Sequence, residues 1–235
     1  MMQRVNRRPM LVIAAAALLG ICAHDKVWAD PRSVVELFTS QGCSSCPPAD
    51  AVAGRLTRDP AVLVLSFHVD YWDELGWKDP YSSTVSTARQ YAYAKSLHQQ
   101  AVFTPQVIVN GSRSLVGSQE RAVRDAVAAA NQGGFCVEAH LSGQTDGRFS
   151  LTLKGPPLSA DVWEARYVRR SSTNVKAGEN GGHTLLTFND VTQFRRLGAY
   201  RNGTLELESL KRPDDGIAVL VQSSGAGRIL GATAY

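Results

Sequence analysis

The sequence predicts an α/β N-terminal domain followed by a β-rich, antiparallel, sandwich-like C-terminal domain. Short apolar runs alternate with segments of helical spacing up to about residue 130, and apolar residues then recur at every second position. Asn131 and the Gly133-Gly134 pair, which favour a break in regular structure, separate the two patterns. We therefore expect one domain over residues 30–132 and a second over residues 133–235.

The first part of the chain predicts four strands and three helices in the order βαβα, then ββα. The strands are expected at 33–39, 61–69, 106–110 and 114–117. The second of these is almost wholly apolar, as in a sheet that is covered on both faces. The helices are expected at 47–56, 84–98 and 119–130, the last of them capped by Ser118 and closed by Asn131.

The second part predicts around seven short strands. Phe135, Val137, Ala139 and Leu141 alternate with polar residues, and further candidates lie at 149–153, 162–168, 184–188, 204–210 and 217–222. Clusters of Gly, Asn, Asp and Pro bound these segments. Short strands at roughly even spacing are typical of an antiparallel sandwich.

The first 29 residues predict a secretory signal peptide. Arg4, Arg7 and Arg8 precede an apolar run from Met10 to Ile21, and Ala29 offers a small residue for cleavage. The run is short for a membrane span, which needs roughly 20 residues, so a retained anchor is the weaker alternative. We expect a periplasmic or secreted protein, cut after Ala29, with no membrane contact after cleavage.

The charge balance gives no reason to expect a nucleic-acid partner. The formal net charge is +4, but the first 29 residues hold four of the 25 basic and one of the 21 acidic residues. The remaining chain has a net charge of +1 and no basic tract that could follow a phosphate backbone.

The strongest chemical signal is the CxxC motif formed by Cys43 and Cys46, which follows a predicted strand and opens a predicted helix. The positive end of the helix dipole favours a thiolate, so we expect Cys43 to have a lowered pKa and to be the attacking sulfur. We expect Cys46, one turn into the helix, to be less exposed and to resolve the mixed disulfide. Pro47 fits the first turn of the helix because it lacks an N–H group.

Three other interpretations of the motif stay open. A zinc site would need a second ligand pair, and the sequence has no second CxxC and no close HxxxH. A soft metal such as copper would use the Cys43 and Cys46 thiolates, with His68 as a further ligand. An inert disulfide would make the chain a protein-interaction module. We expect no metal ligands and no cofactor.

Thr104-Pro105 stands directly before the third apolar strand of the first part. Because proline cannot donate to a strand ladder, it fits the first residue of that strand. A cis bond before Pro105 would turn the Thr104 backbone toward a neighbouring loop. If that loop carries the CxxC motif, Thr104 and Pro105 form a platform for a substrate peptide; an ordinary trans proline is the alternative.

Polar residues follow the second predicted strand, at the strand end where α/β sheets carry their sites. His68, Asp70 and Asp73 are candidates for a proton relay to Cys46 or for metal ligands. The alternative is turn chemistry, with neighbouring aromatic side chains packed on the sheet. Asp79-Pro80-Tyr81 reads as a plain turn.

The order of strand, CxxC, helix, strand, helix and Thr-Pro before a hairpin resembles the thioredoxin fold. The wider chain is similar to a family of secreted bacterial proteins catalogued as domain of unknown function 1223 (DUF1223). The matching stretches are Glu36–Asp50, His68–Asp73, Phe103–Gln106, Val109–Gly111, Gly178–Gly181 and Leu197-Gly198. The resemblance implies a thioredoxin-like domain with a β-rich C-terminal domain, and no settled activity.

Two features limit what the resemblance implies. Gly42 precedes the first cysteine, where ordinary thioredoxins have Trp, and the central dipeptide is Ser44-Ser45. The redox poise therefore does not transfer from thioredoxins. The Gly-rich loop at Gly178–Gly181 reads as a hairpin turn, in which Glu179 or Asn180 has the option of facing the first domain.

Together these observations favour a thiol–disulfide oxidoreductase. Its partners would be protein or small-molecule thiols and disulfides, with Cys43 and Cys46 as the catalytic pair. The oligomeric state, the direction of electron flow and the role of Cys136 have no signal in the sequence.

Overall fold

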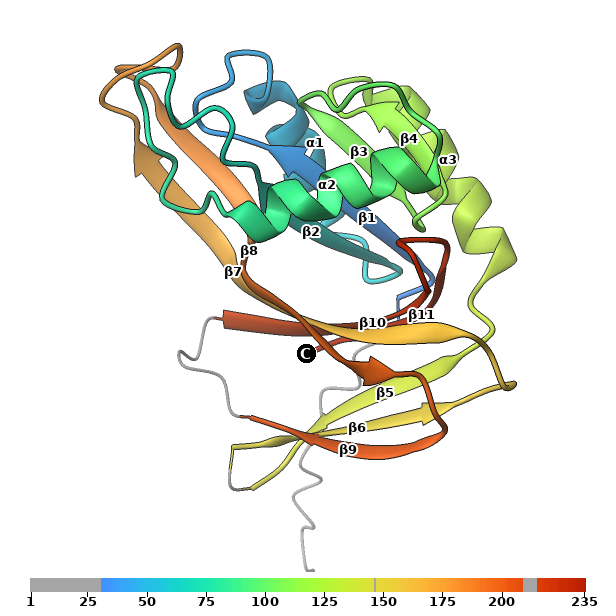
Figure 1. Cartoon of the computed structure of the whole chain (residues 1–235). Coiled ribbons are helices and arrows are strands. Elements are labelled where there is room, and N and C mark those ends of the chain that lie inside the picture. The colour runs from blue at the N-terminus through green and yellow to red at the C-terminus, as the bar shows by residue number, and fades with distance from the viewer. Residues whose placement is uncertain (1–30, 146, 209–214) are drawn as a thin grey trace, which may run out of the picture.

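A computed structural model describes residues 31–145, 147–208 and 215–235 (Figure 1). The expected signal peptide over 1–29 and its cleavage after Ala29 lie outside these residues. In the part of the chain that is described, no helix is both long and apolar enough to cross a membrane.

The central element is a mixed sheet of eight strands. Their order across the sheet is β11-β10-β7-β8-β2-β1-β3-β4. The strands are β1 (Ser33–Thr39), β2 (Val62–His68), β3 (Gln106–Val109), β4 (Arg113–Val116), β7 (Ala160–Asn174), β8 (Thr184–Ala199), β10 (Asp215–Ser223) and β11 (Ile229–Ala234). β2 is parallel to both of its neighbours, β1 and β8, whereas the other pairs are antiparallel.

The expected fold class, an α/β thioredoxin-like N-terminal domain followed by a separate β-rich, sandwich-like C-terminal domain, is wrong. Strands from both sides of the expected boundary at 132/133 join one sheet, in which Ser66 of β2 lies opposite Asp190 of β8. The Ser66 hydroxyl also donates to the carbonyl of Phe188, at 2.7 Å. The Asn189 amide donates to the carbonyl of Val64, at 2.8 Å.

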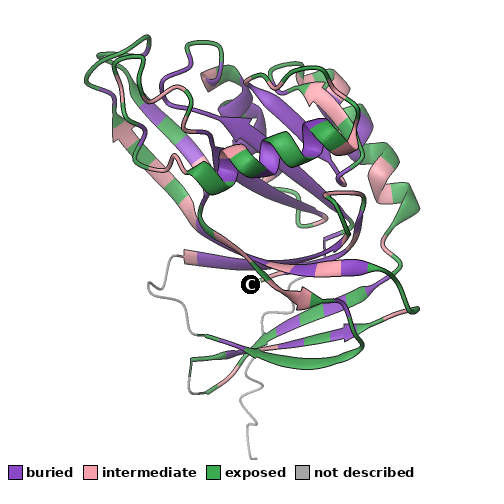
Figure 2. Cartoon of the chain, viewed as in Figure 1, coloured by how far each residue is buried: buried purple, intermediate pink, exposed green. Residues whose placement is uncertain are grey.

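Three helices cover this sheet in the described residues: α1 (Pro47–Leu56), α2 (Thr84–Ser96) and α3 (Glu120–Gly133). Because successive side chains of a strand point to opposite faces, β1 contributes to two cores. Val35 and Leu37 pack with residues of α1 and α3, whereas Val34 and Phe38 pack on the opposite face with Tyr93 of α2. Figure 2 shows how completely β1 and β2 are buried between these layers.

A second sheet of three strands lies against the far end of the large sheet. It has the order β5-β6-β9, with β5 at Glu138–Gly143, β6 at Phe149–Lys154 and β9 at Gly203–Leu207. Its apolar side chains form a third core with Ile217, Val219 and Val221 of β10. The intervening Ala218 and Leu220 point to the other face and join the core beneath α2.

A buried ion pair fixes α2 to the sheet. The Arg89 guanidinium donates to the Glu36 carboxylate, with 2.5 Å between Nε and Oε1, and both side chains are buried. Tyr93 also donates to Glu36, and Gln222 of β10 donates to the Tyr93 hydroxyl at 2.9 Å. A charged pair is tolerated in a core when further hydrogen bonds satisfy it.

Candidate functional site

Cys43 and Cys46 form a disulfide bond in the turn between β1 and α1. The Cα atoms of the two residues are 5.4 Å apart. Helix α1 begins at Pro47, and Cys46 is its N-cap. Cys46 therefore precedes the helix, which corrects the expectation that it lies one turn inside. Pro47 begins the helix because the first helical N–H has no partner within the helix.

Both cysteines are fully buried, although Ser44 and Ser45 between them are exposed. The expectation that Cys43 is the more exposed of the two is therefore wrong. Asn180, in the loop between β7 and β8, donates from Nδ2 to the carbonyl of Gln41 at 2.9 Å and to that of Cys43 at 3.0 Å. The second half of the chain thus contacts the backbone of the turn that carries the disulfide.

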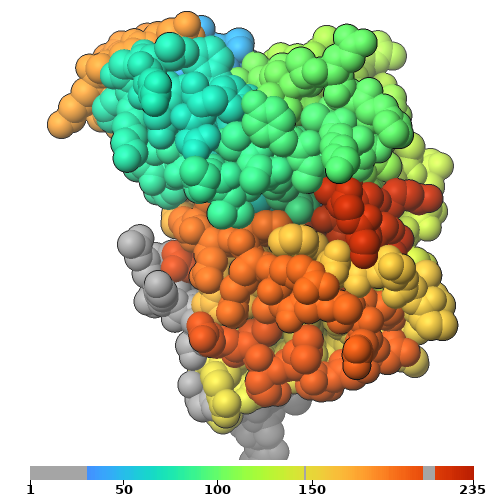
Figure 3. All heavy atoms as spheres, in the orientation of Figure 1, coloured from blue at the N-terminus to red at the C-terminus, as the bar shows by residue number. Residues whose placement is uncertain are grey.

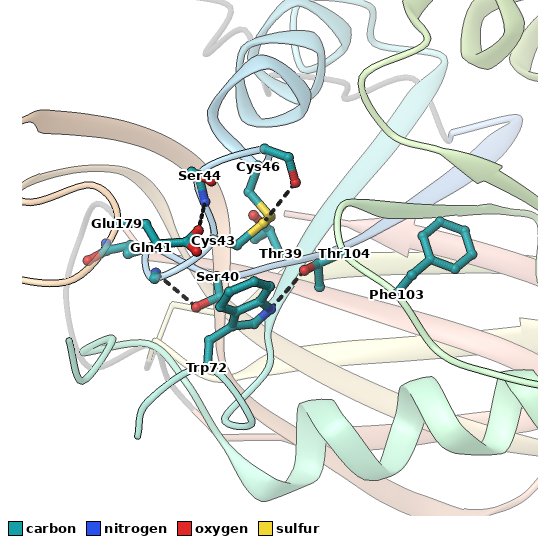
Figure 4. Close-up of a disulfide and its surroundings, with 12 residues drawn as sticks. Thr39, Ser40, Gln41, Cys43, Ser44, Cys46, Trp72, Phe103, Thr104 and Glu179 are labelled. Atoms are coloured by element: carbon teal, nitrogen blue, oxygen red, sulfur yellow. Dashed lines mark hydrogen bonds between the residues drawn. A yellow bond between two sulfur atoms is a disulfide. The ribbon is translucent and has the colours of Figure 1, made fainter. Parts of the chain in front are cut away.

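Glu179 and Trp72 also lie beside the disulfide (Figure 4), and the Ser45 hydroxyl is 3.3 Å from Sγ of Cys43. The Ser44 N–H donates to the Glu179 carboxylate, at 3.0 Å. Hydrogen bonding by the Ser44 side chain, together with this N–H bond, lowers the pKa of Glu179 below its ordinary value, because both stabilise the charged form. A Cβ atom on Gly42 would lie 3.3 Å from the Cβ of Trp72, so the missing side chain lets Trp72 approach the loop closely.

The peptide bond between Thr104 and Pro105 is cis. The indole Nε1 of Trp72 donates to the Thr104 hydroxyl at 2.8 Å, and Figure 4 shows this contact beside the disulfide. In the described residues, the Thr104 N–H and C=O make no hydrogen bond to another backbone group. Trp72 therefore links residues 40–46, which carry the disulfide and are called the cysteine loop below, to the Thr104 backbone, whose N–H and C=O have no backbone partner.

A buried cluster of charged groups lies at the end of β2. The His68 imidazole is between two carboxylates, with Nδ1 2.6 Å from Asp79 and Nε2 3.1 Å from Asp190. Burial by itself would lower the pKa of His68, but the two carboxylates outweigh burial and raise it well above its ordinary value. Asp79 also accepts from the N–H of Gln41 at 2.7 Å, so the cluster reaches the cysteine loop.

The other end of the cluster belongs to the β7–β8 hairpin. Ser171 and Thr187 both donate to the Asp190 carboxylate, at 2.7 and 2.6 Å. A protonated His68 therefore joins two parts of the chain. Through Asp79 it reaches Gln41, before the disulfide, and through Asp190 it reaches β7 and β8. Each buried charge has an opposite charge and further hydrogen bonds, which is the condition for charges to persist in a core.

Asp50 is a further buried acid, on α1 one turn after Cys46. Its carboxylate accepts a hydrogen bond from the Thr39 hydroxyl at 2.9 Å. Burial raises the pKa of Asp50 from the ordinary 3.8 to about 7, and the nearby charge of His68 opposes this shift. Asp50 therefore exchanges a proton near neutral pH.

The three candidates for a proton relay lie in different surroundings. His68 is in the buried cluster described above. The Asp70 carboxylate accepts from the Thr87 hydroxyl at the start of α2, at 2.5 Å. The Asp73 carboxylate accepts from the Ser82 hydroxyl at 2.6 Å and braces the loop that carries Asp79. The relay role of these residues stays a prediction.

Several residues of this site had no clear signal in the sequence. Asp79 looked like part of a plain turn, yet it is buried and paired with His68. Asp50 occurs in a largely apolar stretch of the sequence, and an acid in such a position is a usable signal because a buried acid needs a partner. Asp190 follows Asn189 in what looks like a turn and gave no such signal. Glu179 and Asn180 both face the first part of the chain, which was the alternative for the Gly-rich loop.

One pocket lies beside α1, close to the disulfide, and a second lies farther away, beside α2. A pocket of about 350 Å³ between α1 and β8 is lined in part by Pro47, Asp50 and Phe188. A larger, mostly apolar pocket of about 620 Å³ lies between α2 and the strands β7, β8 and β10. It is on the face shown in Figure 3. No group of three or more potential metal ligands is found among residues 31–145, 147–208 and 215–235.

A comparison with known protein families shows to which family this chain belongs. The family model described as "Protein of unknown function (DUF1223)" matches residues 34–222, which include the disulfide, the buried cluster and its cover. The chain belongs to this family. The expected resemblance to DUF1223 is therefore confirmed, and its match extends across both halves of the large sheet.

Two solved structures are similar to this DUF1223 protein. The crystal structure of protein AGR_C_4864 from Agrobacterium tumefaciens has 29% sequence identity and a TM-score of 0.74, covering 88% of this chain and 94% of that one. HBP35 of Porphyromonas gingivalis has 16% identity and a TM-score of 0.62, covering 88% and 75%, and is similar in fold alone. No curated protein matches the sequence.

Proposed function

We propose that this DUF1223 protein exchanges thiols and disulfides with protein or small-molecule partners, through Cys43 and Cys46. The observation that carries the proposal is the disulfide itself, formed at the start of α1 beside the Thr104-Pro105 segment. We also propose that it works in the periplasm or after secretion, where disulfides persist. The proposal needs no cofactor.

The reaction is a pair of thiol–disulfide exchanges. A thiolate of the partner attacks Sγ of Cys43, a new S–S bond forms, and Cys46 leaves as a thiolate that takes up a proton. A second partner thiolate then attacks the mixed disulfide and releases Cys43. The partner loses two electrons as its own disulfide forms, and the Cys43–Cys46 pair gains them; the reverse sequence oxidises the partner.

The surroundings supply two aids to this exchange. The N-terminus of α1 favours negative charge on a sulfur, because its first N–H groups lack partners within the helix. The Thr104 backbone groups are available to pair with an extended polypeptide beside the sulfurs. Asp50, on α1 near the cysteine loop, has a pKa of about 7, so its carboxyl group can accept or donate the protons that the cysteines release or take up.

A structural disulfide is the second candidate function, and the complete burial of both cysteines favours it. Such a bond would hold the turn between β1 and α1 in an interaction module. The two candidates differ in reduction potential, because structural disulfides resist reduction by the glutathione pool.

Equilibration of the purified protein with glutathione buffers separates the two candidates. A potential between about −270 and −120 mV would support exchange, whereas a value below about −300 mV would indicate a structural bond. Cys46→Ala should then accumulate mixed disulfides on Cys43, because the resolving thiol is missing. The same trap in a Cys136→Ser background controls for the exposed third cysteine.

A further inference from the structure

Exchange with Cys43 requires an approach that the observed structure does not provide. An incoming thiolate must reach a sulfur along the axis of the S–S bond, so its rate depends on access. Both cysteines are fully buried. Some part of the structure must therefore move before any thiol can react.

The β7–β8 loop, residues 175–183, is the segment of the second half of the chain that bonds the turn carrying the disulfide. Its attachment to the cysteine loop consists of polar contacts. Asn180 bonds the carbonyls of Gln41 and Cys43, and Glu179 accepts from Ser44. Within the β7–β8 loop, Val175 and Asn180 are buried, whereas the other residues are exposed. A cover with so little buried apolar surface opens at low cost.

The β7–β8 loop is also braced internally, so it can move as one unit. The N–H of Val175 donates to the carbonyl of His183 at 2.9 Å, and the N–H of Gly182 donates to the carbonyl of Val175 at 2.8 Å. These bonds do not involve the cysteine loop. Opening would therefore break the contacts of Asn180 and Glu179 and the close packing of Gly178 on Trp77, and leave the loop's own turn intact.

Asn180 is the main attachment because it is buried and uses one amide group for two carbonyls. If its side chain were removed, the carbonyl of Gln41 would stay buried without that donor in the closed form, and the carbonyl of Cys43 would keep its bond from the Cys46 N–H, at 3.2 Å. Buried acceptors without partners are unfavourable. The closed form would then lose stability relative to the open form, in which water reaches both carbonyls.

We propose that Asn180 is a positioning residue that holds the β7–β8 loop against the turn carrying the disulfide and thereby sets how fast thiols reach Cys43. This inference rests on the proposed function for its biological meaning, since only an exchange protein would need timed access. The accessibility itself is a physical property and is measured separately.

The test is the rate at which dithiothreitol reduces the disulfide in the folded, full-length protein. One thiolate of dithiothreitol attacks Cys43 and expels Cys46; its second thiol closes a ring and releases Cys43, so two electrons pass to the protein. Asn180→Ala should accelerate reduction about tenfold, the order expected from losing two buried hydrogen bonds. Asn174→Ala, an exposed asparagine of the same hairpin, should react at the wild-type rate.

Asn180→Asp provides a nearly isosteric second variant, in case the alanine variant folds poorly. Its carboxylate would face two carbonyl oxygens, so reduction should again be faster, and more so as the aspartate ionises. Rates are compared per concentration of dithiothreitol thiolate. Rates of both folded variants within twofold of the wild type would overturn the proposal and assign the barrier to another part of the cover.

The glutathione equilibrium keeps this inference distinct from the proposed function. A potential below about −300 mV with accelerated reduction of Asn180→Ala would reject exchange as a function and retain the cover. A potential in the working range with unchanged rates would do the reverse.

Discussion

Replacement of Asp50 by asparagine should make this protein more stable at alkaline pH and change its pH dependence. In the folded state burial raises the pKa of Asp50 to about 7, whereas its ordinary value is 3.8. The folded protein therefore holds a proton that the unfolded chain releases between these values. Stability falls as the pH rises through this window, because the folded state binds more protons than the unfolded state.

The magnitude follows from the two pKa values. Their difference corresponds to about 4 kcal/mol when Asp50 is fully ionised in both states. Between pH 5 and pH 8 the wild type should lose about 2 to 3 kcal/mol from this group. The asparagine side chain of the variant cannot ionise and keeps an oxygen that accepts from Thr39. The stability difference between the variant and the wild type should therefore grow by that amount.

Urea unfolding at pH 5 and pH 8, followed by tryptophan fluorescence without reductant, measures both differences. Asp125→Asn serves as the control, because Asp125 is exposed on α3. His68 titrates in both proteins, so its contribution largely cancels in the comparison. A difference between Asp50→Asn and the wild type that stays constant from pH 5 to pH 8 would refute the reasoning.

Two further substitutions test the packing around the site. His68→Leu should destabilise the protein by about 3 to 5 kcal/mol, because Asp79 and Asp190 lose the buried cation between them. Gly54→Ala should destabilise it by about 1 to 3 kcal/mol despite the helix preference for alanine, because the new Cβ would lie 2.3 Å from the Phe188 ring. Chemical unfolding at pH 7 measures both.

Each substitution has a matched control in the described residues. His140 is exposed on β5, so His140→Leu should change stability little. A Cβ on Gly133, at the end of α3, would contact nothing within 4 Å, so Gly133→Ala should be neutral or slightly stabilising. If His68→Leu cost no more than its control, the ion cluster would not be a significant source of stability. The clash would be disproved by a Gly54→Ala protein as stable as the wild type.

Local patterns were sufficient for many elements. The apolar run at 61–69 becomes β2, and the helix expected at 47–56, with Pro47 in its first turn, is α1 with the same bounds. The CxxC motif forms its disulfide where the strand–turn–helix context placed it. These features depend on neighbours within a few residues, which a single sequence carries.

The assembly of the sheet depends on distant neighbours and was not predictable in this way. Asn189-Asp190 looks like a turn, so the expected strand at 184–188 ended there. In the structure, Asn189 has a positive φ of 52° and the strand continues to Ala199. The Asn189 side chain bonds β2, and Asp190 pairs with His68. By local sequence alone, Asn189 and Asp190 would end the strand. In the fold, they connect β8 to β2 instead.

The same reasoning applies to the candidate site. Cys43 has a local signal for reactivity, but its carbonyl accepts a hydrogen bond from Asn180, 137 positions later in the chain. Asp79 belongs to a turn by its local sequence, and its burial follows from His68 and Gln41. Burial and ion pairing are properties of the assembled fold, so the sequence indicates the chemistry of these residues more readily than their surroundings.

The pairing of β8 with β2 has a consequence for any attempt to divide the chain. A fragment that stops near residue 132 would leave β2 as an edge strand, with its apolar residues and its backbone groups open to another molecule. Such edges recruit further strands and promote aggregation. It would also leave His68 without Asp190 and the cysteines without Asn180. The two halves are therefore expected to fold and unfold as one cooperative unit.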